Sequence, residues 1–201
     1  DYSIESLRRA QAAIQSGAFA DEIVPVTVST RKGDVVVDTD EQPGRGMPDK
    51  IPTLRPAFAK DGTITAATSS SISDGAAALV LTRESVAKAN GQTPIARIVA
   101  HAAHAQEPAA FTTAPVGAIE KLLKKAGWTI DEVDLFEINE AFACVAMFAM
   151  KDLGIPHDKI NVNGGATALG HPIGASGARI ITTLVAALKN HKWTNIKDQV
   201  D

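Results

Sequence analysis

The sequence NVNGGATALGHPIGASGAR, residues 161–179, places five glycines around a single histidine, His171. Glycine loses more conformational freedom on folding than other residues, so clustered glycines usually mark tight turns, positive φ angles or close approach of a ligand or backbone. Packing alone does not explain this density, and we interpret the segment as a site built largely from main chain. Pro172 restricts the residue before it to extended or turn conformations. We therefore expect a non-helical backbone at His171, with free space beside it at Gly170 and Gly174.

A second unusual segment, EINEAFA at residues 137–143, lies where an apolar stretch at 133–138 gives way to a predicted helix at 140–151. Asn139 stands at this junction, and the simplest role for an asparagine there is to cap the helix. The simplest role for His171 is that of a solvated loop histidine. Because both residues stand at the ends of strands or loops, they could instead converge on one oxygen atom. Two such donors would form an oxyanion hole, which stabilises an enolate or a tetrahedral alkoxide.

These two segments, together with GTITAATSSSISDGAAA at residues 62–78, closely resemble the thiolase family. The third segment is similar to the family's thioester-site loop, which leads into a core strand. The resemblance extends along the whole chain, from the N-terminal helix and its GAFADEIVPV ending at residues 17–26 to the helix after Arg179. The pair GHPIGASG and NEAFA at this spacing is highly specific. Among thiolases the chain is most similar to acetyl-CoA acetyltransferases and fatty-acid 3-ketoacyl-CoA thiolases.

The resemblance implies an α/β fold, the layered αβαβα thiolase fold, present here only in part. It divides the chain into the end of a loop domain that covers coenzyme A (residues 1–72), the last strand and helix of the N-terminal core domain (73–93) and the C-terminal core domain without its final strands (94–201). Hydrophobic periodicity also predicts alternating strands and helices. The predicted helices are 3–17, 83–90, 115–126, 140–151 and 176–189, and the predicted strands are 23–29, 34–37, 78–82, 95–101, 133–138 and 159–163.

The resemblance also indicates what this chain lacks. Thiolases carry a nucleophilic cysteine in their first half and an acid/base cysteine in a Gly-rich turn near the C-terminus. The only cysteine here is Cys144, just inside the helix after NEAFA, where the family commonly has a small apolar residue. Nothing near it in the sequence supplies a cation that would activate the thiol, so we interpret Cys144 as a packing residue. We expect the chain to be a piece of a thiolase that is inactive by itself.

The activity implied by the resemblance is that of an acyl-CoA acetyltransferase. A cysteine absent from this chain attacks a 3-ketoacyl-CoA, releases acetyl-CoA and leaves an acyl-enzyme, which coenzyme A then cleaves. In reverse, two acetyl-CoA molecules condense to acetoacetyl-CoA. His171 would activate the nucleophile and donate to the thioester oxygen of the enolate, and Asn139 would hold the water that is the second donor. Coenzyme A and acetyl-CoA are then substrates, and no tightly bound cofactor is expected.

The resemblance assigns a further group of residues to coenzyme A. Ser70 matches the family serine that contacts the pantetheine arm, and Arg45, in a proline-rich segment at 40–56, is the candidate for the adenine end. A long irregular segment of this kind favours a binding loop over a plain connection. The chain departs from the commonest family pattern at Thr68 and in residues 111–115, which leaves the acyl-chain preference open. The apolar walls would be Leu54, Phe58, Ala66 and Phe142, with core packing as the alternative role for the two phenylalanines.

Composition limits the other classes of function. The chain is 45% hydrophobic and carries 20 basic and 23 acidic residues, so its net charge of -3 implies no general attraction to nucleic acid or to a membrane surface. A single cysteine fits a reducing compartment, and we expect a cytoplasmic protein. His101 and His104 have a spacing compatible with metal binding, but no carboxylate or cysteine completes a ligand set, so no metal is expected. By resemblance we expect a homodimer or a homotetramer.

Three hypotheses about function remain open from the sequence. The first is an active thiolase, of which this chain is one part. The second is a non-catalytic relative that binds acyl-CoA, and the third is a half-subunit that needs a separate partner chain. The presence or absence of both cysteines in the complete enzyme separates the first from the others.

Overall fold

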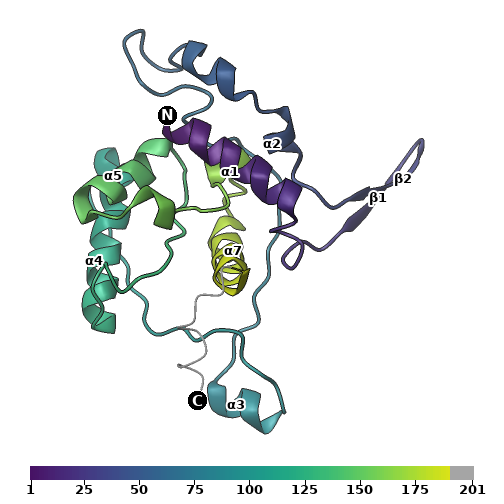
Figure 1. The fold of residues 1–201 in the computed structure, drawn as a ribbon, viewed down its shortest axis with the longest axis vertical. Helices are drawn as coiled ribbons and strands as arrows, with labels where there is room; N and C mark the ends of the chain where they lie inside the picture. Colours follow the sequence, from purple (N-terminus) through teal and green to yellow (C-terminus); the bar gives the residue numbers. More distant parts are fainter. Residues whose placement is uncertain (191–201) are drawn as a thin grey trace.

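The computed structural model describes residues 1–190. In Figure 1, α7 lies in the middle of the molecule, with α1 on one side and α4 and α5 on the other, while the β1–β2 hairpin projects outward. The elements in chain order are α1 (Tyr2–Ser16), β1 (Val26–Thr30), β2 (Gly33–Val37), α2 (Glu41–Arg45), η1 (Pro48–Thr53), α3 (Glu84–Ala89), η2 (Pro108–Thr113), α4 (Ala114–Ala126), α5 (Ala143–Leu153), η3 (His157–Lys159), α6 (Ala166–Leu169) and α7 (Ser176–Asn190).

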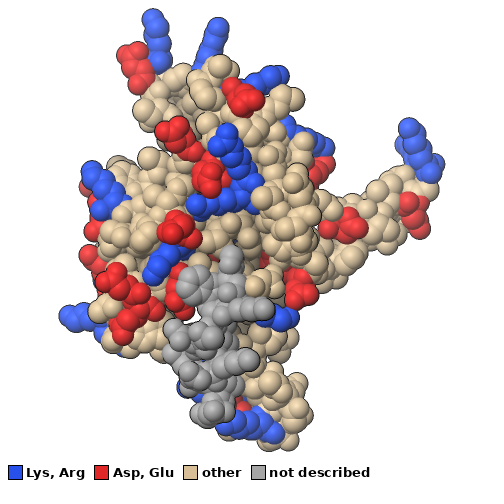
Figure 2. Space-filling model, in the orientation of Figure 1, with Lys and Arg blue, Asp and Glu red and all other residues tan. Residues whose placement is uncertain are grey.

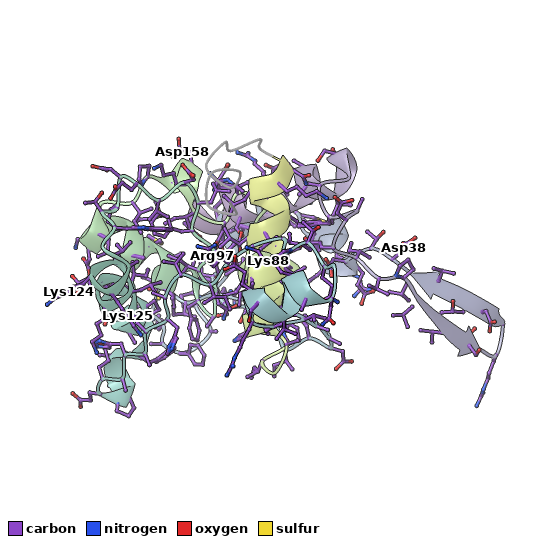
Figure 3. All side chains as sticks on the ribbon, turned by 90° about the horizontal axis from the view of Figure 1, so that it is seen from below. Asp38, Lys88, Arg97, Lys124, Lys125 and Asp158 are labelled. Atoms are coloured by element: carbon purple, nitrogen blue, oxygen red, sulfur yellow. The ribbon has the colours of Figure 1, made fainter. Side chains whose placement is uncertain are left out.

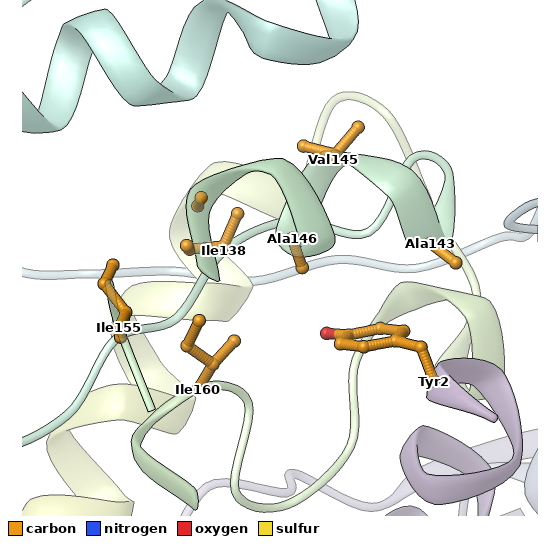
Figure 4. Packing of buried hydrophobic residues seen from close by; sticks show 8 residues of the cluster. Tyr2, Ile138, Ala143, Val145, Ala146, Ile155 and Ile160 are labelled. Carbon is orange, nitrogen blue, oxygen red and sulfur yellow. The ribbon is translucent and has the colours of Figure 1, made fainter. Parts of the chain in front are cut away.

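The principal core lies between α5 and the two segments that lead into and out of it. Helix α5 presents small residues at helical spacing, and Ala146 and Ala149 are completely buried, so the neighbouring backbone can approach closely. Ile160 fills the space opposite and is also completely buried. Figure 4 shows Tyr2 of α1 reaching into the same cluster. The cluster thus fastens α1 to the C-terminal half of the chain. Its buried members are Tyr2, Ile138, Ala143, Val145, Ala146, Ala149, Ile155 and Ile160.

The predicted helices are largely confirmed. Helix α1 stops at Gly17, whose φ of 74° is the left-handed C-cap conformation that glycine adopts without strain. Helix α5 begins at Ala143 rather than at residue 140. The proline-rich segment 40–56 was expected to be irregular, but it contains the short helices α2 and η1. Within residues 1–190 no helix is long and apolar enough to cross a membrane.

Two of the six predicted strands are confirmed and form an antiparallel hairpin. Val26 pairs with Val37 and Thr30 with Gly33, so the turn consists of two residues. Every residue of β1 and β2 is exposed. The hairpin is therefore an arm on the surface and contributes nothing to the buried core.

The other four strand predictions are wrong for the described residues. Segments 133–138 and 159–163 meet only at a single parallel bridge between Phe136 and Ile160. Segments 78–82 and 95–101 have no ladder partner within residues 1–190. A strand requires a neighbour for its backbone N–H and C=O groups, however favourable its side chains are. Segments 78–82 and 95–101 instead leave apolar side chains in solvent: Val80 is 96% exposed and Ile98 is 65% exposed.

Charged side chains of both signs are mixed over the surface. Figure 2 shows acidic and basic residues side by side on the visible face rather than gathered by sign. In Figure 3, Lys124 lies on the outside of α4, and Asp38 lies where the chain leaves β2. Lys88 and Arg97 both pair with Glu84, at 2.9 and 3.5 Å. This face of the molecule therefore presents no extended basic surface.

Candidate active site

Asn139 and His171 meet in the structure although they are 32 residues apart in sequence. The side-chain Nδ2 of Asn139 lies 3.3 Å from Nε2 of His171, in a half-buried position. Asn139 directly follows the extended segment 133–138, and His171 lies in the loop between α6 and α7. The two residues singled out from the sequence are therefore in direct contact.

Asn139 does not cap helix α5. The N-cap residue is Phe142, whose extended backbone, with φ of −136°, precedes the first helical turn. The capping role considered for Asn139 is therefore wrong, and its amide is available for another contact. Among the described residues, its Oδ1 is buried and has no hydrogen-bond partner. A buried acceptor without a partner is uncommon in folded proteins and calls for a reason.

Two further contacts hold His171 in its loop. Its backbone N–H donates to the carbonyl of Ser71 at 3.1 Å, and its Nδ1 lies 2.6 Å from the hydroxyl oxygen of Ser176. The expectation of a non-helical backbone at His171 is confirmed. Free space was expected beside it at Gly170 and Gly174. It exists only at Gly174, since a Cβ at Gly170 would collide with the hydroxyl group of Ser73.

Close packing explains two of the glycines that the sequence suggested were not packing residues. A Cβ at Gly165 would collide with the carboxyl group of Glu140. A Cβ at Gly164 would lie 2.5 Å from the carbonyl oxygen of Ser6, and its φ of 78° is a conformation that favours glycine. The interpretation that packing does not account for the glycines is therefore wrong at these positions. Gly164 and Gly165 instead allow the loop to pack directly against α1 and Glu140.

Glu140 is the centre of a buried hydrogen-bond network that sequence reasoning missed. Its side chain is completely buried. One carboxylate oxygen accepts from the Tyr2 hydroxyl and from Asn161 Nδ2, both at 2.8 Å. The other accepts from the Ser6 hydroxyl at 2.9 Å and from the backbone and hydroxyl of Thr167 at 3.1 and 2.6 Å. Burial, followed by the charge of Glu140, raises the pKa of the Tyr2 hydroxyl.

The Glu140 network fixes the separation of Asn139 and His171. Glu140 adjoins Asn139 in the chain, and Thr167 lies four residues before His171. One carboxylate therefore binds both segments that supply the candidate site, and α1 as well. The available signal was the position of Glu140 inside the NEAFA motif, as a charged residue at the end of an apolar stretch.

A second buried acid, Glu137, lies two residues before Asn139, and few groups compensate the burial of its carboxylate. Its side chain is 3% exposed, and Nη1 of Arg179 is 3.9 Å from its carboxylate. Neither of its oxygens has a hydrogen-bond partner within the part of the chain that the structure describes. Burial raises the pKa of Glu137 to about 8, against the opposing effect of Arg179. Burial also raises the pKa of the nearby Glu22 and Asp40.

No metal centre is formed by residues 1–190, since no three His, Cys, Asp or Glu side chains among them are grouped to hold an ion. His104 Nε2 instead faces the side chain of Gln106 at 3.2 Å. The sole cysteine, Cys144, is half-buried on α5. Neither residue contributes to the candidate site.

Three of the six residues assigned to coenzyme A line one cavity of about 300 Å³ between α1 and η1. Arg45, Leu54 and Ala66 all contribute to its wall. Lys50 supplies a second positive charge and Thr167 connects the wall to the Glu140 network. The cavity thus combines cationic and apolar groups, which is the chemistry that a phosphate-bearing apolar ligand requires.

The other three residues assigned to coenzyme A, Ser70, Phe142 and Phe58, do not line this cavity. The backbone N–H and the hydroxyl of Ser70 both donate to the carbonyl of Ala141 at 3.0 Å, inside the NEAFA motif. Phe142 packs against the principal core and against the ring of Phe111, with centroids 6.0 Å apart. Core packing therefore accounts for part of its surface. Phe58 is 80% exposed, so core packing is wrong for that residue.

Comparison with known proteins places the whole chain in one family. Residues 1–85 match the family model described as "Thiolase, N-terminal domain", and residues 92–196 match "Thiolase, C-terminal domain". The acetyl-CoA acetyltransferase of Yarrowia lipolytica is 51% identical over 193 residues, which are 96% of this chain and 49% of that protein. The acetyl-CoA acetyltransferase of Escherichia coli is 50% identical over 190 residues, 94% of this chain and 48% of that protein.

Solved structures agree with the sequence comparison. The acetyl-CoA acetyltransferase of Bacillus anthracis superimposes with a TM-score of 0.90 at 43% identity, over 94% of this chain and 48% of that chain. Acat5 thiolase from Ascaris suum, solved in complex with coenzyme A, gives 0.84 at 43% identity, over 93% and 48%. The chain spans about half the length of the curated relatives it matches. With both domain models matched and relatives that are half identical in sequence, the chain belongs to the thiolase family.

Proposed function

We propose that this chain supplies the oxyanion-hole part of an acyl-CoA acetyltransferase active site. The observation that carries the proposal is the contact between Asn139 Nδ2 and His171 Nε2 at 3.3 Å. Helix capping does not account for the position of Asn139, since Phe142 is the N-cap of α5. Both belong to the segments in which the chain most resembles thiolases.

In the proposed thiolysis, Nε2 of His171 takes the proton of a cysteine thiol that lies outside these 201 residues. The thiolate attacks the keto carbon of a 3-ketoacyl-CoA, and the bond between that carbon and its α-carbon breaks. The electron pair passes to an acetyl-CoA enolate, whose oxygen accepts hydrogen bonds from protonated His171 and from a water held by Asn139. An acid outside the chain protonates the enolate carbon. The partnerless Oδ1 of Asn139 suits this role, because it can accept a hydrogen from the water.

The cavity beside η1 is the proposed place for part of coenzyme A. Arg45 and Lys50 would face phosphate groups, while Leu54 and Ala66 would contact the apolar arm. Ser70 and Phe142 would lie nearer the thioester, because both are held at the NEAFA motif. Phe58 is exposed and would be covered only by the ligand. The coenzyme A complex of the Ascaris suum relative supports a substrate of this class.

The test is acetoacetyl-CoA thiolysis by the enzyme that contains this chain together with the nucleophilic cysteine, identified first by the intact mass of the purified protein. His171→Ala is expected to lower kcat by about 100- to 10,000-fold with little change in folding. His101→Ala is the matched control, since that histidine is exposed on another segment. Turnover close to wild type in the His171 variant would overturn the proposal. Coenzyme A binding without thiolysis in the wild-type enzyme would support a non-catalytic relative instead.

A half-subunit that needs a partner chain is the second candidate, and one observation favours it. Segments 78–82 and 95–101 expose apolar side chains and lack ladder partners among the described residues. A second polypeptide that adds strands to them would bury both. Co-purification of a separate chain carrying the nucleophile would support this form, while one polypeptide of about twice the mass would exclude it. A homodimeric or homotetrameric enzyme in the cytoplasm completes the proposal, by resemblance and from the single cysteine.

A further inference from the structure

Ser176 begins helix α7 and lies directly against the imidazole of His171. Its hydroxyl oxygen is 2.6 Å from Nδ1, the ring nitrogen that faces away from Asn139. The residue is 4% exposed, so water does not compete for this contact. Among the described residues, Ser176 is the one buried residue of α7 with a hydrogen-bond contact to His171.

The hydroxyl group of Ser176 has a second contact that offers its hydrogen another acceptor. Its oxygen is 3.0 Å from the carbonyl oxygen of Pro172, which can only accept a hydrogen bond. A hydroxyl has a single hydrogen to donate. When that hydrogen is directed to Pro172, the short contact with His171 must use the hydrogen on Nδ1.

The other side of the imidazole agrees with this arrangement. Nδ2 of Asn139, which carries two hydrogens, faces Nε2 of His171. A neutral imidazole that donates from Nδ1 has its lone pair on Nε2, where it can accept from that amide. Both ring nitrogens then have a partner of the correct kind.

We propose that Ser176 is a positioning residue for His171: it accepts the Nδ1 proton, fixes the ring plane and keeps the lone pair on Nε2, toward the place where a thiol proton would arrive. The part played in thiolysis rests on the proposed function. The tautomer itself does not, because it follows from contacts within this chain. A thiol that delivers its proton to Nε2 replaces the amide donor of Asn139 there. Ser176 still accepts from Nδ1 after this transfer, so its hydroxyl group suits both states of the ring.

The direct test is the tautomer of His171, measured by long-range proton–nitrogen NMR of the ¹⁵N-labelled chain at a pH where the imidazole is neutral. The His171→Gln variant assigns the signal. We expect the proton on Nδ1 in the wild type, a mixture of tautomers in Ser176→Ala and the wild-type pattern in Ser176→Thr, which keeps the hydroxyl. A proton on Nε2 in the wild type, or an unchanged tautomer in Ser176→Ala, would overturn the proposal.

Thr182→Ala is the matched control. Thr182 lies on the same helix, and its hydroxyl makes the same kind of bond, to the carbonyl of Ala178 at 3.0 Å, without contact to His171. This variant is expected to keep the wild-type tautomer. If Ser176→Ala does not fold, the spectra of the wild type and of Ser176→Thr still show whether the proton of His171 lies on Nδ1.

Kinetics of the enzyme that carries the nucleophile test the role in catalysis. Ser176→Ala is expected to lower kcat about tenfold or more at nearly unchanged KM, as a share of the roughly 100- to 10,000-fold that a positioned base supplies. Ser176→Thr should recover most of the loss. Absence of thiolysis in the wild type, with the Nδ1 tautomer observed, would refute the proposed function and leave the positioning intact. Thiolysis together with the Nε2 tautomer would support the proposed function and overturn the positioning role of Ser176.

Discussion

The hydroxyl of Tyr2 donates to Oε1 of Glu140 at 2.8 Å inside the core, although the two residues are 138 positions apart in sequence. The bond joins the first turn of α1 to the motif that carries Asn139. Burying a carboxylate costs several kcal/mol unless donors surround it. Here donors come from α1, from Asn161 and from Thr167. The candidate site is therefore held together by a charge that takes no part in the proposed chemistry.

Glu140→Gln tests this network. The amide keeps the shape of the side chain but replaces one accepting oxygen with a donor that faces the hydroxyls of Ser6 and Thr167 or of Tyr2. Since bonds to a charged group contribute roughly 1.5–3 kcal/mol each, the free energy of unfolding should fall by about 2–4 kcal/mol in a urea titration. Tyr2→Phe, which removes a single donor, should cost less. A loss below about 1 kcal/mol for Glu140→Gln would contradict the network's importance.

Asn139→Ala separates the capping role from the oxyanion role. Loss of one oxyanion donor lowers kcat by roughly 100- to 1,000-fold, whereas loss of a helix cap lowers stability by about 1 kcal/mol. Because Phe142 is the N-cap of α5, we expect the kinetic effect without the loss of stability. Thiolysis by the nucleophile-bearing enzyme and thermal unfolding of the same preparation give both numbers. A loss of stability with an unchanged kcat would show that Asn139 has a structural role instead.

Glu137 should make stability fall as the pH rises. Its pKa is raised from 4.5 to about 8 in the folded protein, chiefly by burial. The folded state therefore holds a proton that the unfolded state has lost over this range. The stabilisation is complete below about pH 4.5 and is lost progressively as the pH rises through about 8.

Glu137→Gln should flatten that decline, because the amide does not titrate. Urea titrations at several pH values between about 4.5 and 8 compare the two proteins. The carboxylates of Glu140 and Glu22 and the guanidinium of Arg179 act on Glu137 and remain in the variant. Glu22 and Asp40 should leave a residual slope of the same sign, since their pKa values are also raised. Equal slopes in the two proteins would show that Glu137 does not titrate in this range.

Gly165→Ala tests the close approach of the glycine loop to Glu140. The added Cβ would collide with the buried carboxyl group, so the free energy of unfolding should fall by about 1–3 kcal/mol. Gly177→Ala is the matched control, because a Cβ there meets no atom of the described residues within 4 Å and the position is helical. That variant should be neutral or more stable by up to about 1 kcal/mol. Equal effects at the two positions would contradict the packing argument.

Glycine density and the NEAFA motif mark His171 and Asn139 locally, so the sequence was sufficient to single out two residues that lie 3.3 Å apart in the structure. It also predicted the long helices, whose periodicity depends on neighbours three and four residues away. The hydrogen-bond network of Glu140 was not predicted because two of its partners, Tyr2 and Ser6, lie far away in sequence. No local sequence pattern indicates such contacts. The four strand predictions failed for a related reason. Their composition favours extended backbone, but a ladder also needs a partner, which local composition cannot specify.

The β1–β2 arm has a consequence for the behaviour of the protein in solution. The cross-strand pairs Val26–Val37 and Val28–Val35 give the ribbon one β-branched apolar face, and the four side chains are 45–57% exposed. Exposed ribbons of this kind are templates for edge-to-edge polymerisation, which charged residues at the turn oppose. In this arm that protection comes from Arg31, Lys32 and Asp34 at the tip. Colloidal stability at high concentration therefore depends on a few charges far from the candidate site, and high salt or neutralisation of the tip should promote fibrous aggregation before the core unfolds.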